Sequence, residues 1–160
     1  MKENSAKIIT KLAVLTALNV ALSYLVHIPI TATSGFINLV EAGILFAALS
    51  YGKNAGFIVG AMSGALLDLL AGYPQWIIFS FLIHGLEGYV VGFAAQGSLK
   101  KQIIYSTIGT IIMLIGYTLA GSFLYNWTAG IASIPTNMIQ GIAGAVVAFF
   151  LFKATKNYQQ

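Results

Sequence analysis

The sequence predicts an all-α integral membrane protein, a bundle of six transmembrane helices that forms a single domain over residues 1–160. The first observation is the composition: 58% of the residues are hydrophobic and only 8% are charged, whereas soluble proteins carry about 25% charged residues. Such a chain needs lipid as its solvent, and only helices and closed barrels satisfy their backbone hydrogen bonds there. The apolar runs are continuous rather than alternating, which favours helices over barrel strands.

The apolar runs have lengths that suit a bilayer, which a helix crosses with about 20 residues in a range of about 17 to 25. The second run is shorter than the others. The predicted helices cover approximately residues 8–28, 36–51, 55–71, 75–95, 102–125 and 133–152. Turn-forming glycine, proline and asparagine stand at the breaks, including a loop over residues 126–134.

The distribution of lysine predicts the orientation of this bundle. The sequence contains no arginine, and its lysines stand at positions 2, 7, 11, 53, 100, 101, 153 and 156. With six spans all of them fall on one side, and the positive-inside rule places that side, with both termini, in the cytoplasm. The first apolar run also has features of a signal peptide, but about twenty residues exceed a usual signal core. Scattered lysines form no basic stripe, so we expect no nucleic-acid partner.

Polar side chains inside the predicted spans gather toward the extracellular half of the bundle. An ionised acid at the centre of a spanning helix costs roughly 2.5–3.5 kcal/mol, so such residues usually face a bundle interior, a partner or a watery cavity. Together with aromatic rings they could hold a small polar aromatic ligand that arrives from outside. The candidate ligand-binding residues are Asn38, Glu41, Trp76, His84, Tyr117, Asn137 and Gln140.

Several of these residues also have simpler interpretations, which the sequence leaves open. Trp76 could belong to an interfacial aromatic belt, as could the tyrosine and tryptophan at positions 125 and 127. His84 could serve as a helix–helix hydrogen bond. Glu87 stands three residues after His84 and could pair with it. Asp68 could cap the outer loop at the end of its helix.

Catalytic and metal-binding motifs are missing from the sequence. It contains no cysteine, no HExxH, no GxSxG and no phosphate-binding loop. We therefore expect no catalytic residues, no metal site and no cofactor, and any ATP hydrolysis must come from partner subunits.

Small residues recur at helical spacing on three of the predicted helices. Ala13, Ala17 and Ala21 follow one another at intervals of four residues, which places them on one face of the first helix. In lipid such a face lets another helix approach closely, so we expect these alanines to dock a second protein. Glycines 56, 60 and 64 on the third helix and 88 and 92 on the fourth are expected to serve packing within the bundle.

These features together resemble the substrate-binding S components of energy-coupling factor (ECF) vitamin transporters. The alanine face of the first helix is similar to their alanine motif. The stretches GFINLVEA at 35–42 and DLLAGYPQW at 68–76 resemble the branch assigned to hydroxymethylpyrimidine, a thiamin precursor, or to pyridoxine-like compounds. The resemblance covers nearly the whole chain.

The resemblance implies a multi-pass protein of the prokaryotic plasma membrane that binds a vitamin from outside. Its partners would be a transmembrane coupling subunit (the T component), docked on the alanine face, and two ATPase subunits that use the ATP. It further implies that the loop at about 29–35 covers the binding site. Because the chain has no arginine, a neutral or weakly basic heteroaromatic ligand is expected rather than a strongly anionic one. The alternative function is a standalone ion-coupled carrier or channel that works through Glu41 or Asp68.

Overall fold

The computed structural model describes residues 5–26, 28–30 and 35–157 of the chain. Helices dominate it, and the only described strands are β1 and β2. The elements in chain order are α1 (Ser5–Leu25), β1 (Ile28–Ile30), β2 (Gly35–Ile37), α2 (Val40–Tyr51), α3 (Lys53–Ala71), the 3₁₀ turn η2 (Pro74–Trp76), α4 (Ile77–Val91), the 3₁₀ turn η3 (Gly92–Ala94), α5 (Leu99–Leu124), α6 (Trp127–Ala132) and α7 (Ile134–Asn157).

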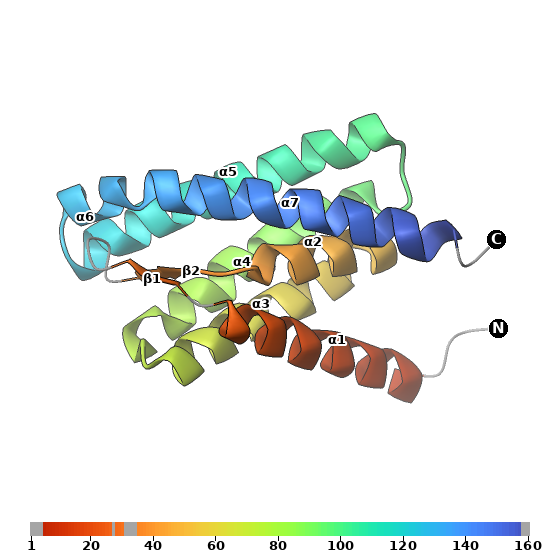
Figure 1. The fold of residues 1–160 in the computed structure, drawn as a ribbon, viewed down its shortest axis with the longest axis horizontal. Coiled ribbons are helices and arrows are strands. Elements are labelled where there is room, and N and C mark those ends of the chain that lie inside the picture. Colours follow the sequence, from red (N-terminus) through yellow and green to blue (C-terminus); the bar gives the residue numbers. More distant parts are fainter. Residues whose placement is uncertain (1–4, 27, 31–34, 158–160) are drawn as a thin grey trace.

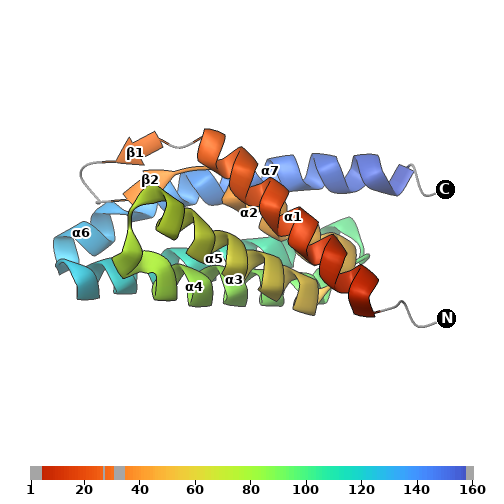
Figure 2. The same cartoon turned by 90° about the horizontal axis from the view of Figure 1, so that it is seen from below.

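The long helices run roughly side by side along one axis, with α1 inclined across the others (Figures 1 and 2). The first turn of α1 and the last turn of α7 lie at one end of the bundle, while β1, β2 and α6 lie at the opposite end. The six predicted helices correspond to α1, α2, α3, α4, α5 and α7, so the all-α membrane bundle is confirmed. The cytoplasmic location of the termini stays a prediction.

Helix α2 forms the centre of the bundle although it is the shortest of these six. It packs against α1, α3, α4 and α7, and Ile44, Leu45 and Leu49 are fully buried along it. At about 1.5 Å per residue, its 12 residues are too short to cross a hydrocarbon core about 30 Å thick. The strand β2 precedes it and supplies part of the remaining length.

The predicted helix over 36–51 is therefore wrong in its first four residues. Residues Gly35–Ile37 form β2, which pairs antiparallel with β1, so that Pro29 lies opposite Phe36. Asn38 lies between strand β2 and helix α2. Its Oδ1 accepts a hydrogen bond at 2.7 Å from the backbone N–H of Val40, the first residue of α2. Such a hydrogen bond between an asparagine side chain and the nearby backbone competes with helix formation at Asn38. Most of the predicted cover at 29–35 lies outside the described residues.

Other differences lie at the ends of elements. The predicted loop over 126–134 contains the short helix α6, which Asn126 caps by accepting a hydrogen bond from the backbone N–H of Ala129 at 2.9 Å. Helix α1 ends at Leu25 rather than at 28, and α7 continues to Asn157 rather than to 152.

Glycines bring α3 and α4 into close contact, and this pair forms the most extensive helix interface of the described residues. A Cβ at Gly56 would collide with the backbone carbonyl of Gly88, and one at Gly88 with that of Gly56. Gly60 approaches the carbonyl of His84 in the same way. The predicted role of these glycines in internal packing is confirmed.

Large apolar side chains cover the outside of the bundle, as a protein surrounded by lipid requires. Ile78 on α4, Phe123 on α5 and Phe150 on α7 are each at least 71% exposed. Five of the described helical segments are long and apolar enough to cross a membrane, with α2 as a shorter apolar helix beside them.

Candidate ligand-binding pocket

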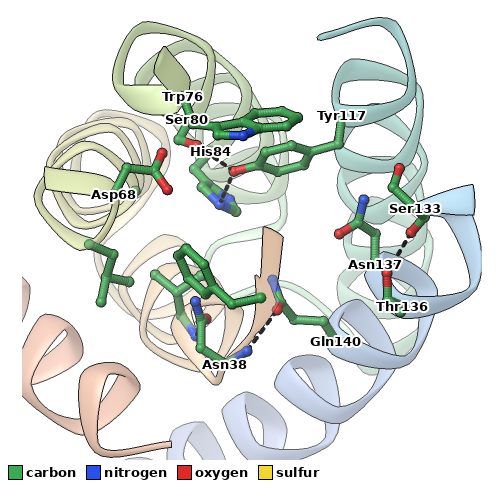
Figure 3. A pocket seen from close by; sticks show the side chains of 14 residues that line it. Asn38, Asp68, Trp76, Ser80, His84, Tyr117, Ser133, Thr136, Asn137 and Gln140 are labelled. Carbon is green, nitrogen blue, oxygen red and sulfur yellow. Dashed lines mark hydrogen bonds between the residues drawn. The ribbon is translucent and has the colours of Figure 1, made fainter. Parts of the chain in front are cut away.

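A pocket lies between the helices (Figure 3), and its lining includes residues of β2 and of the first turn of α7. The space between its walls, with the open mouth included, is about 600 Å³. Its lining residues are Phe36, Asn38, Val40, Gly64, Leu67, Asp68, Trp76, Ser80, His84, Tyr117, Ser133, Thr136, Asn137 and Gln140.

The structure brings six of the seven predicted ligand-binding residues together around this pocket. They are Asn38, Trp76, His84, Tyr117, Asn137 and Gln140. The seventh, Glu41, does not line the pocket: it is fully buried beneath it and accepts a hydrogen bond from Nε2 of Gln140 at 2.9 Å. Glu41 thus contacts the lining residue Gln140, and its contact with the ligand stays a prediction.

Trp76 and Tyr117 provide the aromatic wall of the pocket. Their ring centroids lie 5.7 Å apart at an interplanar angle of 46°, and Figure 3 shows the indole above the phenol. The indole Nε1 of Trp76 donates to the hydroxyl of Tyr125 at 3.2 Å, which fixes its orientation. Trp76 is only 7% exposed whereas Trp127 is 63% exposed, so the first tryptophan faces the pocket and the second faces outward.

A chain of hydrogen bonds joins the aromatic wall to the floor. The hydroxyl of Tyr117 lies 2.7 Å from Oγ of Ser80 and 2.8 Å from Nε2 of His84, and both contacts are drawn in Figure 3. Nδ1 of His84 in turn lies 3.1 Å from Oε2 of Glu87. The predicted His84–Glu87 pair is therefore present, and His84 joins two helices as well as lining the pocket.

Asn38 and Gln140 hold the β-hairpin strand against α7. The backbone N–H of Asn38 donates to Oε1 of Gln140 at 2.8 Å, while Nε2 of Gln140 donates to Glu41. Gln140 has its amide oriented by both contacts. This wall of the pocket is consequently built from β2, α2 and α7 together.

Asp68 also lines the pocket, although it was not among the predicted ligand-binding residues. It was considered as a loop cap, but it is 5% exposed and its carboxylate points from α3 into the pocket (Figure 3). Its Oδ2 has no hydrogen-bond partner in the described structure. The sequence feature that could have indicated a lining role for Asp68 is its position at the start of the stretch 68–76, which ends in the predicted ligand-binding residue Trp76. Ser133, which lies between α6 and α7, and Thr136, in the first turn of α7, were also not predicted and line the opposite side.

The three alanines predicted to dock a partner lie on an open face of α1. Ala13, Ala17 and Ala21 are all exposed. The opposite side of α1, with Leu12 and Asn19, packs against the bundle, where α1 contacts mainly α2 and α3.

Comparisons with known proteins agree on one family. The family model of the ECF-type riboflavin transporter S component matches residues 3–157. The thiamine precursor transporter HmpT of Lactococcus lactis subsp. cremoris is 33% identical over 149 residues, which cover 92% of this chain and 87% of the relative. An uncharacterized protein of Pyrococcus woesei is 30% identical over 77% of this chain and 84% of its own.

A solved structure shares the fold. The S component of a bacterial ECF transporter superposes with a TM-score of 0.78 at 24% identity, over 98% of this chain and 99% of the other. The chain belongs to the ECF-type riboflavin transporter S component family, whose members are multi-pass proteins of the bacterial plasma membrane that bind a vitamin or vitamin precursor for transport and are not enzymes.

Proposed function

We propose that this chain captures a hydroxymethylpyrimidine-type or pyridoxine-like compound from outside the cell and delivers it through an ATP-driven module. The observation that carries the proposal is the buried Asp68 carboxylate, whose Oδ2 has no hydrogen-bond partner in the described structure and which lies in one polar pocket with Trp76 and Tyr117. A small heteroaromatic ring that donates hydrogen bonds complements both features.

The chemistry of the pocket supports this ligand class. The ring face of the ligand would lie against the indole of Trp76, and an amino group or protonated ring nitrogen would donate to Asp68 in a charge-assisted hydrogen bond. The amide of Asn137 and the hydroxyls of Ser133 and Thr136 suit a hydroxymethyl substituent. Because no lysine or arginine is among the described residues that line the pocket, a phosphorylated ligand would lack a cationic partner there.

The similarity to HmpT favours a thiamin precursor over riboflavin, which the family description names. A direct test measures binding of hydroxymethylpyrimidine, pyridoxine and riboflavin to the purified protein by isothermal titration calorimetry, alongside native mass spectrometry for retained ligand. We expect hydroxymethylpyrimidine or pyridoxine to bind most tightly. Preferential binding of riboflavin would contradict the assignment of the ligand.

A substitution at Asp68 tests whether this residue contacts the ligand. Asp68→Asn removes a charge-assisted acceptor worth about 1.5–3 kcal/mol, so we expect affinity to fall by about tenfold or more. Ser122→Ala is the matched control, because Ser122 lies at the same end of the bundle but donates to the backbone of Thr118 rather than lining the pocket. Equal affinity of wild type and D68N would show that Asp68 does not contact the ligand.

Delivery requires a T component, which docks on the exposed alanine face of α1, and two ATPase subunits, which use the ATP. Ala17→Trp should abolish copurification of the T component while ligand binding persists. Leu22→Trp is the control, since Leu22 is also exposed but lies roughly 140° around the helix from Ala17. Normal assembly of A17W would refute the docking surface, and uptake by this chain alone in liposomes would favour a standalone carrier instead.

A further inference from the structure

Three side chains of metal-ligating type meet in the bundle interior beneath the pocket. They are Glu41 from α2 and His84 and Glu87 from α4, each at most 3% exposed. Nδ1 of His84 lies 3.1 Å from Oε2 of Glu87 and 3.7 Å from Oε1 of Glu41. One ligand atom from each residue lies within 4.8 Å of the other two.

The cluster contains more acceptor oxygens than the surrounding residues satisfy. Oε2 of Glu41 and Oε1 of Glu87 are buried and have no hydrogen-bond partner in the described structure. The ion pairs that the structure shows for these carboxylates both involve the same imidazole, His84. Burying a carboxylate without a compensating charge costs free energy. A cation bound between Glu41 and Glu87 would therefore stabilise the folded protein.

Neighbouring residues orient two of the three side chains, His84 and Glu41, in the way that metal ligands require. The hydroxyl of Tyr117 contacts Nε2 of His84 at 2.8 Å and leaves Nδ1 directed at the carboxylates. Gln140 fixes one oxygen of Glu41 at 2.9 Å and leaves the other unpartnered. Such outer contacts set the tautomer and direction of metal ligands.

The spacing of the ligand atoms also fits a metal ion. Ligand atoms about 2.1 Å from a tetrahedrally coordinated zinc ion lie roughly 3.4 Å from one another. Nδ1 of His84 lies 3.1 Å from one carboxylate and 3.7 Å from the other, and one ligand atom from each of the three residues lies within 4.8 Å of the other two. One imidazole with two carboxylates suits zinc, manganese or iron better than calcium or magnesium, which prefer oxygen ligands alone.

We infer that Glu41, His84 and Glu87 form a binding site for one divalent transition-metal ion beneath the ligand pocket. The ion would join α2 to α4. Through His84 and the Glu41–Gln140 contact, it would also hold the floor of the pocket in place. This inference does not depend on which vitamin the pocket receives.

The test uses the full chain, purified in detergent and treated with a chelator. Co²⁺ serves as a spectroscopic probe, and Zn²⁺ bound after dialysis is counted by elemental analysis. We expect one equivalent per wild-type chain, visible Co²⁺ d–d absorption, and an increase in melting temperature with Zn²⁺ because the ion binds the folded state. Absence of binding to the wild-type protein would overturn the inference without any variant.

Glu41→Gln and Glu87→Gln change the cluster while preserving side-chain size. Each should lower metal affinity at least about tenfold and remove the Zn²⁺-dependent increase in melting temperature. Asp68→Asn is the matched control, because Asp68 is also a buried acid but is not part of the cluster, and it should retain the metal. Metal binding that persists unchanged in E41Q and E87Q would mean that the ion binds elsewhere, which refutes the site.

Discussion

Replacing Gly56 by alanine tests whether the close contact between α3 and α4 determines the stability of the bundle. The added Cβ would collide with the carbonyl of Gly88, which is backbone and cannot rotate away. Overpacking of a tight interior costs typically about 1–3 kcal/mol, and we take the upper end because the obstacle is rigid. Alanine recovers about 1 kcal/mol of helix propensity over glycine, which leaves a net loss of about 2 kcal/mol.

Gly85→Ala is the matched control on the same interface. A Cβ there meets the ring of Phe57 at 3.0 Å and the Cβ of Ala61 at 3.2 Å, and the phenylalanine ring can move by a few tenths of an ångström. The small steric cost and the gain in helix propensity should nearly cancel. G85A should therefore unfold at nearly the wild-type temperature while G56A unfolds well below it.

The assay is thermal or denaturant-induced unfolding of the purified protein in detergent, combined with ligand-binding measurements. Separation of α3 from α4 moves Asp68 away from Ser80 and His84, so G56A should also bind ligand more weakly. The double variant G56A/G88A should cost less than the sum of the two single changes, because both disturb the same contact. If G56A proves as stable as G85A, the argument from backbone contact is wrong.

Three further predictions concern the pocket, α1 and the orientation of the chain. Trp76→Ala should weaken ligand binding by about 3- to 10-fold, from the loss of aromatic contact worth about 0.5–1.5 kcal/mol, whereas Trp127→Ala, on the exposed side, should leave calorimetric affinity unchanged. Asn19→Ala should lower the free energy of unfolding by about 1–3 kcal/mol, because the buried amide of Asn19 ties α1 to α2 and α3 through hydrogen bonds of 3.0 and 3.1 Å; an unchanged unfolding midpoint would show that these bonds are replaced. A single cysteine introduced at Thr128 should react with an impermeant maleimide on intact cells, and one at Ser98 only after permeabilisation; the reverse pattern would invert the proposed orientation.

Composition and periodicity were sufficient to predict the bundle because lipid imposes strict rules on backbone hydrogen bonding. They were insufficient at residues 36–39, where the apolar run in FINLV has the same composition whether it is strand or helix. The decisive contact there is between Asn38 and Gln140, which are 102 residues apart in the sequence. Such a contact has no local signal.

The sequence likewise predicted one part of the candidate site and missed another. Depth within each span predicted that Asn137, Gln140 and Tyr117 would lie at one level of the membrane, and the structure places them around one pocket. Depth alone could not show which side of its helix a residue occupies relative to its neighbours. For this reason Asp68, near the end of α3, looked like a loop cap, and Glu41 looked like a lining residue although it lies below the floor.

The pairing of β1 with β2 affects how quickly a ligand could leave. Two strands of three residues each make a ribbon that is marginally stable on its own, while the helices around it are held by extensive packing. Phe36 and Asn38 therefore border the pocket from its most easily separated wall. Escape through this side requires the detachment of a short ribbon, with the loss of the Phe36–Tyr73 ring contact and of the Asn38–Gln140 bond. Residence time and equilibrium affinity can therefore be tuned by different residues.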